Sequence, residues 1–195
     1  MKNKAVFLDR DGTINVDKGY TFKKEDLELI PGVVEGLKLL QESSYNLVIV
    51  TNQSGIARGY FTEEDYFAFR KEMHKRLEEQ GVSISAEYFC PHHSEKGIGK
   101  YKIDCNCRKP KTGILEEAAR DFNLNLKNCW IIGDHESDIR AGKNAECRTI
   151  HILTGHVTVP IKEADFIARD MIEAAHYIIK TNKKPLCSFF PWKRI

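Results

Sequence analysis

The chain has 195 residues, of which 42% are hydrophobic and 30% charged, and its formal net charge is +2. This length predicts one domain with a substantial core, and the composition is that of an ordinary soluble globular protein. The near-neutral charge argues against a nucleic-acid-binding surface. All apolar runs are too short to span a membrane. In the basic start MKNKAVFLDRDG, only four apolar residues precede the next charged ones. We therefore expect a cytoplasmic protein without a signal peptide.

Short apolar runs alternate with amphipathic patterns along the chain, as in a doubly wound, Rossmann-like α/β fold. The predicted strands cover residues 5–8, 47–50, 87–89, 129–132, 148–153 and 165–168. The predicted helices cover residues 31–43, 62–80, 112–122 and 170–181. Thr62 and Asp65 form a capping box, Gly81 stops the helix that they open, and Thr112 is expected to cap the next one. We expect a mostly parallel sheet with helices on both faces in a domain of residues 1–182, followed by a tail of residues 183–195.

Several predicted strands end in residues suited to phosphoryl chemistry. Asp9 and Asp11 follow the first strand, Thr51 ends the second, and Asp134 follows the fourth. Ligands of such sheets bind outside the carboxyl ends of the strands, so these side chains are expected to meet there. Two carboxylates that point the same way repel each other unless a cation lies between them, and this set of oxygens suits Mg²⁺. Taken alone, Asp-x-Asp leaves a simple turn with a capping aspartate as the alternative.

Four motifs in chain order resemble those of the haloacid dehalogenase superfamily: DRDGT at 9–13, TNQSG at 51–55, RKPKTG at 108–113 and GDHESD at 133–138. The resemblance covers nearly the whole chain and implies a magnesium-dependent phosphomonoester hydrolase that works through an aspartyl-phosphate. It implies Asp9 as nucleophile and Asp11 as general acid/base, with Thr51 and Lys109 holding the transferring phosphoryl group. The implied magnesium ligands are Asp9, Asp11 and Asp134, while Asp138 would position the metal's water or Lys109. About twenty residues separate Asp11 from Pro31, enough for a flap but not for a large cap domain.

A cysteine- and histidine-bearing segment, residues 90–107, follows the third predicted strand. Cys90, His92, Cys105 and Cys107 stand at its two ends, and the intervening residues are polar and rich in glycine and lysine. Three thiolates and one imidazole make a closed tetrahedral Zn²⁺ site with no open position for a reactive water, so the expected zinc is structural. A metal can replace an apolar core in such a segment. The alternative is a chance cluster of cysteines, and His93 is expected to be a solvated loop residue.

The segments CPHH…CNCRKPKTG and TNQSGIARG resemble the D-glycero-D-manno-heptose 1,7-bisphosphate phosphatases and the related histidinol-phosphate phosphatases. In that group the zinc ligands correspond to Cys90, His92, Cys105 and Cys107. TNQSGIARGYFT and NVDKGY are closer to the heptose branch, since the histidinol branch has an acidic residue in place of Ser54. The implied reaction converts heptose 1,7-bisphosphate to heptose 1-phosphate in the synthesis of nucleotide-activated heptose, lipopolysaccharide or another surface glycan. The implied substrate contacts are Asp17, Lys18, Gly19, Tyr20, Asn52, Gln53, Ser54 and Arg108, the last of these a bidentate partner for a second phosphate.

Other functions stay open at this stage. The same chemistry could act on histidinol phosphate, or on the phosphorylated end of a polynucleotide, although the charge counts against the latter. A zinc-stabilised binding module without catalysis is a third reading, against which the complete catalytic set counts. The basic, aromatic tail KKPLCSFFPWKRI is better interpreted as a strap or a frayed end than as a membrane contact. We expect a monomer that binds a small sugar bisphosphate and neither nucleic acid nor a membrane.

Overall fold

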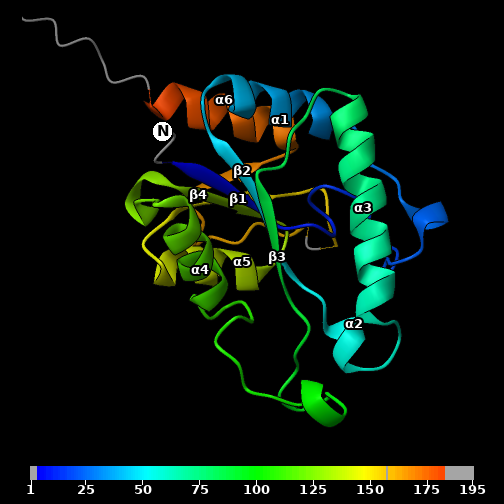
Figure 1. The fold of residues 1–195 in the computed structure, drawn as a ribbon. Helices are drawn as coiled ribbons and strands as arrows, with labels where there is room; N and C mark the ends of the chain where they lie inside the picture. Colours follow the sequence, from blue (N-terminus) through cyan, green and yellow to red (C-terminus); the bar gives the residue numbers. More distant parts are fainter. Residues whose placement is uncertain (1–3, 157, 183–195) are drawn as a thin grey trace, which may run out of the picture.

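The computed structural model of the protein describes residues 4–156 and 158–182 (Figure 1). Within this part, six parallel strands form one sheet in the order β3-β2-β1-β4-β5-β6. They are β1 (Ala5–Leu8), β2 (Asn46–Asn52), β3 (Ala86–Cys90), β4 (Trp130–Gly133), β5 (Arg148–Ile152) and β6 (Phe166–Ala168). The chain builds outward from β1 to β3 and then returns to place β4 on the other side of β1. The predicted doubly wound α/β fold is confirmed, and the strand order reverses between β1 and β4.

The sheet separates two apolar cores because alternate residues of each strand point to opposite faces. Val6 and Leu8 of β1 face a core covered by α1 (Val33–Glu42), α3 (Glu63–Glu79) and α6 (Met171–Asn182). Ala5 and Phe7 face a second core covered by α4 (Gly113–Phe122) and α5 (Glu136–Asn144). Figure 1 shows α1 and α6 together on one side of the sheet and α4 and α5 on the other. Burial of alternating apolar residues on both faces holds the strand ends in fixed positions.

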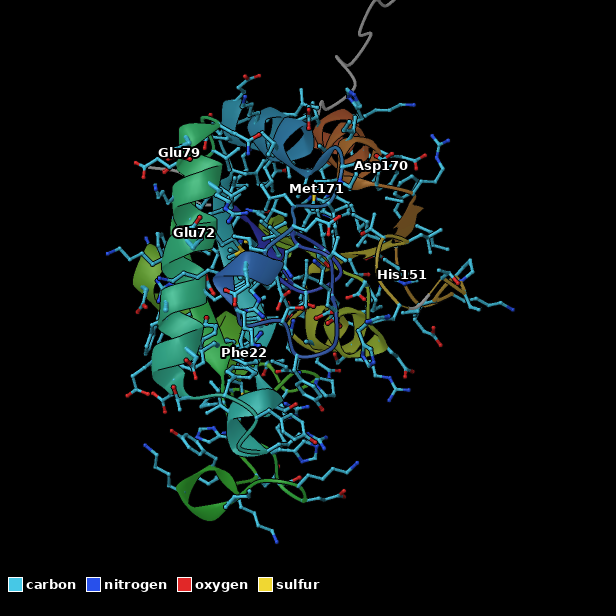
Figure 2. The ribbon with its side chains drawn as sticks, turned by 90° about the vertical axis from the view of Figure 1, so that its right-hand side faces the viewer. Phe22, Glu72, Glu79, His151, Asp170 and Met171 are labelled. Atoms are coloured by element: carbon cyan, nitrogen blue, oxygen red, sulfur yellow. The ribbon has the colours of Figure 1, made fainter. Side chains whose placement is uncertain are left out.

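Close packing fixes α6 against α1. A Cβ atom added at Gly36 in α1 would lie 2.5 Å from the main-chain oxygen of Met171, the first residue of α6. Met171 and Asp170, at the start of α6, are labelled beside α1 in Figure 2. Only a glycine allows the two helices to approach so closely, so the residue at position 36 of α1 is determined by its packing against α6.

Helix ends agree with the predictions in some places and differ in others. The capping box of Thr62 and Asp65 at the start of α3 is confirmed, and Gly81 follows that helix with a φ of +80°. Thr112 stands at the N-cap position of α4, as predicted, but its side chain does not cap the helix: the hydroxyl donates to Glu116 Oε1 at 2.7 Å and no backbone N–H reaches it. Thr112 has helical backbone angles, with a φ of −93° and a ψ of −12°, rather than the extended ones from which a capping hydroxyl accepts an N–H of the first turn.

Two helices were not predicted. The short α2 (Ser54–Ala57) and α5 both begin inside motifs interpreted for their chemistry. α5 is opened by a capping box of His135 and Asp138, and its first turn is too polar to reveal an apolar stripe. The residues of the last motif therefore serve both as a site and as a helix start.

Loops at the carboxyl edge of the sheet provide the remaining structure. The segment between Asp11 and Pro31 contains one 3₁₀ turn, η1 (Lys24–Asp26), and Phe22 stacks on Phe61 near α2 with ring centroids 4.8 Å apart (Figure 2). Further 3₁₀ turns are η2 (Gly99–Tyr101) and η3 (Leu126–Asn128). The loop that contains η2 extends beyond the sheet next to α2 (Figure 1). Among the described residues, no helix has the length and apolar character needed to cross a bilayer.

Candidate active site

A cleft of about 300 Å³ opens at the carboxyl ends of β1, β2 and β4, where the strand order reverses. Its lining contains twelve of the residues that the sequence analysis singled out. These are Asp9, Asp11, Asp17, Gly19, Tyr20, Thr51, Asn52, Gln53, Ser54, Arg108, Lys109 and Asp134. Lys18 is not among the lining residues: its exposed ammonium group pairs with Glu28 at 3.2 Å. Residues from four separate motifs thus converge on one cavity.

Lys109 lies at the centre of this site, almost completely buried. Its Nζ donates to Asp9 Oδ1 at 2.8 Å and to the carbonyl of Val50 at 2.7 Å, and it pairs with Asp138 Oδ1 at 2.5 Å. Burial alone would lower the pKa of Lys109, but the neighbouring carboxylates of Asp138 and Asp9 raise it above its ordinary value. The ammonium group therefore keeps its proton and stays directed at Asp9.

Asn52 fixes the backbone of Lys109. The side-chain amide of Asn52 donates to the Lys109 carbonyl at 3.0 Å, and its oxygen accepts from the Lys109 N–H at 3.1 Å. Two hydrogen bonds in opposite directions determine both the position and the rotation of that peptide. The side chain that the sequence analysis assigned to substrate contact thus also holds the catalytic-site lysine.

Three carboxylates form a candidate metal centre. Ligand oxygens of Asp9, Asp134 and Asp138 lie within 4.8 Å of one another. Burial, together with the charge of Asp138, raises the pKa of Asp9 to about 8 and that of Asp134 to about 6, although Lys109 counteracts the effect at both. One lysine cannot neutralise three carboxylates, so the cluster suits a divalent cation with a preference for oxygen ligands, such as Mg²⁺. The structure brings Asp138 into the cluster, whereas Asp11 as a magnesium ligand stays a prediction.

Two glycines enclose the carboxylate of Asp134. A Cβ atom added at Gly12 would lie 2.5 Å from Asp134 Oδ2, and one added at Gly155 would lie only 1.8 Å from it. Gly12 also has a φ of +78°, which favours glycine, and its carbonyl accepts from Thr154 Oγ1 at 2.7 Å. Gly155 and Thr154 are not among the site residues predicted from the sequence. Their position just after a predicted strand, where ligands bind in this fold, was the available signal.

The carboxylate of Asp11 has partners of its own. It accepts hydrogen bonds from Arg10, from Asn15 Nδ2 at 3.0 Å and from Gln53 Nε2 at 3.0 Å. The expectation that Asp9 and Asp11 point the same way required the strand to continue, but β1 ends at Leu8. Gln53 Nε2 also donates to Thr51 Oγ1 at 2.8 Å and so links the end of β2 to Asp11.

The rim of the cleft contains charged and aromatic side chains. Asp17 pairs with His156 Nε2 at 3.1 Å, and the ring of Tyr20 meets Tyr60 edge-on with centroids 4.7 Å apart. His135 and His156 line the cleft as well, and the sequence analysis did not propose either as a substrate contact. Nδ1 of His135 accepts from Ser137 N at 3.2 Å, so this ring is held at the start of α5.

The predicted zinc residues form a second cluster. The sulfur of Cys105 lies 3.4 Å from that of Cys90 and 3.2 Å from that of Cys107, and Nδ1 of His92 lies 3.5 Å from Cys107 Sγ. Four ligands about 2.0–2.3 Å from one Zn²⁺ ion have tetrahedral edges of roughly 3.4–3.8 Å. All four ligand atoms also lie within 4.8 Å of one another, so the arrangement is compatible with zinc.

The cysteine–histidine cluster is connected to the cleft through the next residues of the chain. Arg108 Nη1 donates to the carbonyl of His92 at 3.2 Å, and both Arg108 and Lys109 line the cleft. His93 lies outside the cluster, where its Nδ1 accepts from two backbone N–H groups of the same loop. The conformation of this loop therefore affects where the side chains of Arg108 and Lys109 face the cleft.

Known proteins are similar to this chain over nearly its whole length. A family model described as HAD-hydrolase-like matches residues 106–178. The D-glycero-beta-D-manno-heptose-1,7-bisphosphate 7-phosphatase of Haemophilus influenzae is 41% identical over 185 residues, which cover 93% of this chain and 100% of that protein. The D-glycero-alpha-D-manno-heptose-1,7-bisphosphate 7-phosphatase of Campylobacter jejuni is 44% identical over 85% of this chain and 89% of its own length. The crystal structure of D,D-heptose 1,7-bisphosphate phosphatase from B. bronchiseptica, complexed with magnesium and phosphate, matches with a TM-score of 0.80 and 27% identity, over 91% of this chain and 99% of that one.

Proposed function

Because the chain belongs to the heptose bisphosphate phosphatase family of haloacid dehalogenase-like hydrolases, we propose that it hydrolyses a D-glycero-D-manno-heptose 1,7-bisphosphate to heptose 1-phosphate and inorganic phosphate. The observation that carries this proposal is the end-to-end similarity to relatives of that name, combined with one cleft in which Asp9, Thr51 and Lys109 converge. The product would serve the synthesis of an activated heptose for a surface glycan.

Asp9 is the proposed nucleophile. One of its carboxylate oxygens forms a bond to the phosphorus atom while the bond between phosphorus and the sugar oxygen breaks. The ammonium group of Lys109, 2.8 Å from Asp9, faces the same region and compensates the charge on the transferring oxygens. Thr51 Oγ1 already accepts from Gln53, which leaves its own proton available to a phosphoryl oxygen.

Asp11 is the proposed general acid and base. It donates a proton to the sugar oxygen as that oxygen leaves, and it then takes a proton from the water that attacks the phosphorus of the aspartyl-phosphate. The second step breaks the bond between phosphorus and Asp9 and releases phosphate. Position supports this assignment, since Asp11 lines the same cleft as Asp9 but keeps different hydrogen-bond partners.

Magnesium is the proposed catalytic metal. Asp9 and Asp134 would hold it, with Asp138 beside them and Asp11 as a further predicted ligand. When bound, magnesium supplies positive charge that neutralises the carboxylates and the phosphoryl oxygens. Asp138 is buried and paired with Lys109, and it accepts from the His135 N–H at 3.1 Å, so we assign it to positioning that lysine.

Zinc is the proposed structural metal of the loop that holds Arg108. Cys90, His92, Cys105 and Cys107 would bind it with no open coordination position. Arg108 would then contact the second phosphate or the sugar hydroxyls from a loop that has little apolar packing of its own. Asp17, Tyr20 and Ser54 line the same cleft and are proposed to contact the sugar.

We also propose a cytoplasmic location and a monomeric state. The cysteines at 90, 105, 107, 129 and 147 are all free, as in proteins of reducing compartments. Size-exclusion chromatography with light scattering would check the monomer, and a dimer at micromolar concentration would contradict it.

A phosphate-release panel tests the proposed substrate. The purified enzyme with Mg²⁺ is given the α and β anomers of heptose 1,7-bisphosphate, fructose 1,6-bisphosphate and histidinol phosphate, with Asp9→Asn as the control. We expect the highest kcat/KM for one heptose anomer, with phosphate leaving from carbon 7. A higher kcat/KM for histidinol phosphate would move the chain to the other branch of its family.

A further inference from the structure

Arg10 stands between the two catalytic aspartates, and its side chain is completely buried. Val6 and Leu8 of β1 point into the core beneath α3, and the guanidinium group of Arg10, just past the end of β1, lies against Phe69 of that helix. An arginine in an apolar core is costly unless its charge is paired and its N–H groups are bonded. Its contacts therefore indicate why the charge is there.

The guanidinium group of Arg10 holds the carboxylate of Asp11. Its Nη2 donates to Asp11 Oδ1 at 2.8 Å and to Oδ2 at 2.7 Å, and its Nε donates to Oδ1 at 3.2 Å. Nη2 also donates to the carbonyl of Thr21 at 2.8 Å. A planar guanidinium group that contacts both carboxylate oxygens determines the rotation of the carboxylate as well as its place.

A second layer holds Arg10 itself. Its guanidinium lies over the ring of Phe69 of α3, 4.6 Å from the centroid, and 5.8 Å from that of Tyr66. The buried carboxylate of Glu87 accepts from Tyr66 Oη at 2.5 Å and meets His74 Nε2 at 2.6 Å. Burial would lower the pKa of Arg10, but the negative charges of Asp11 and Glu87 raise it. The arginine thus lies between two carboxylates, one at the cleft and one inside the fold.

These contacts separate Asp11 from the metal cluster. The cluster of Asp9, Asp134 and Asp138 carries surplus negative charge and attracts a cation, whereas Arg10 already neutralises Asp11. To serve as the acid for the leaving sugar oxygen, the Asp11 carboxylate must keep one oxygen off the metal, so any further contact of Asp11 with magnesium cannot use the oxygen that transfers the proton. The orientation of the Asp11 carboxylate therefore determines whether it can donate a proton to the leaving sugar oxygen.

We propose that Arg10 is the positioning residue for the acid/base carboxylate of Asp11, an inference that rests on the proposed role of Asp11. Arg10 acts through Asp11 and touches neither the metal nor the reacting phosphoryl group. Lysine cannot replace it, because an ammonium group offers one nitrogen and lacks both the second contact that Arg10 Nε makes to Oδ1 and the rigid plane that fixes the rotation of the carboxylate.

A leaving-group comparison tests this role in the full-length enzyme with Mg²⁺. kcat/KM is measured for Arg10→Lys and Asp11→Asn on heptose 1,7-bisphosphate, whose sugar oxygen needs a proton, and on p-nitrophenyl phosphate, whose leaving group departs as a stable anion. For Asp11→Asn we expect a loss on the heptose ester that exceeds the loss on the aryl ester by about 100-fold or more. For Arg10→Lys we expect the loss of kcat/KM on the heptose ester to exceed the loss on the aryl ester by about 10- to 100-fold.

Each outcome separates the two proposals. Equal losses on both esters for Arg10→Lys, beside a selective loss for Asp11→Asn, would leave only a structural role for Arg10 and overturn the inference. Equal losses for Asp11→Asn would instead refute the proposed acid/base role. Circular dichroism melting checks folding, and if Arg10→Lys is unfolded, Asn15→Ala takes its place because Asn15 donates to the same Asp11 oxygen. A selective loss for Asn15→Ala supports the holding of Asp11, and a non-selective loss or no loss contradicts it.

Discussion

The carboxylate cluster of Asp9, Asp134 and Asp138 and the cysteine–histidine cluster of loop 90–107 both suit a metal ion, but they are built in opposite ways. The carboxylates stand at the ends of strands whose side chains fill two cores, so the sheet places them whether or not a cation is present. The cysteine–histidine loop extends beyond the sheet, and most of its residues between 91 and 107 are at least partly exposed. The first site is preorganised by the core, whereas we propose that the second site needs a bound metal to become ordered.

This contrast matters because the two clusters are only two residues apart along the chain. Cys107 belongs to the loop, and Lys109 is buried among the carboxylates. Loss of the loop metal should therefore change the catalytic site from outside, without removing any of its groups. Changes confined to one cluster should therefore distinguish the two kinds of site.

Removing the proposed nucleophile should have the largest effect. We expect Asp9→Asn to lower kcat by at least about 1,000-fold, because the amide cannot form the covalent intermediate. The fold should persist, since the substitution removes one of three crowded carboxylates. Phosphate release and thermal melting measure the two effects, and substantial turnover by this variant would rule out Asp9 as the nucleophile.

Disrupting the loop should weaken catalysis without removing a catalytic group. We expect Cys105→Ser to lose bound zinc and to lower kcat/KM by about 10- to 100-fold, because Arg108 and Lys109 lose their support. Elemental analysis and kinetics provide the measurements. Cys147→Ala is the matched control, since Cys147 is buried in the core beneath α5 and should leave the zinc content unchanged. A native enzyme free of zinc but fully active would contradict the structural role.

The enclosure of Asp134 can be tested by adding a single methyl group. In Gly155→Ala the new Cβ would lie 1.8 Å from Asp134 Oδ2, so the carboxylate must move. We expect the Mg²⁺ concentration for half-maximal activity to rise by about 10-fold or more. The zinc content should stay the same, which distinguishes a local effect from general unfolding. An unchanged Mg²⁺ requirement would show that Asp134 does not need this position.

The pH dependence of metal-free stability should show the surplus charge of the cluster. Burial raises the pKa of Asp9 from 3.8 to about 8 and that of Asp134 from 3.8 to about 6, so the folded state binds protons that the unfolded state has released. Stability in a chelator should therefore fall as the pH rises from about 4 to 6 and further towards 8. Excess Mg²⁺ should reduce that decline, and Asp9→Asn should make it shallower. Thermal unfolding across this pH range, with and without Mg²⁺, gives the comparison, and identical slopes in both conditions would contradict the assignment.

Features that depend on near neighbours along the chain could be predicted from the sequence. Apolar runs predicted all six strands with ends within about three residues, and the capping box of Thr62 and Asp65 follows from residues three apart. The motifs predicted a site at the strand ends, and twelve of the residues that they contain or adjoin line one cavity there. These predictions worked because strand pleating and capping are local, and because ligands of this fold class gather at one edge of the sheet.

Features that depend on contacts between distant segments of the chain could be seen only in the folded structure. Lys109 is 100 residues away from Asp9 along the chain. The strand order and the two hydrogen bonds between the Asn52 side chain and the Lys109 backbone bring them together. The direction of Asp11 follows from Arg10, whose role needs partners on α3 and β3. Gly155 has no visible function until Asp134 lies against it. A side chain in a loop takes the direction that its partners in space impose, and the linear sequence does not state which partners those are.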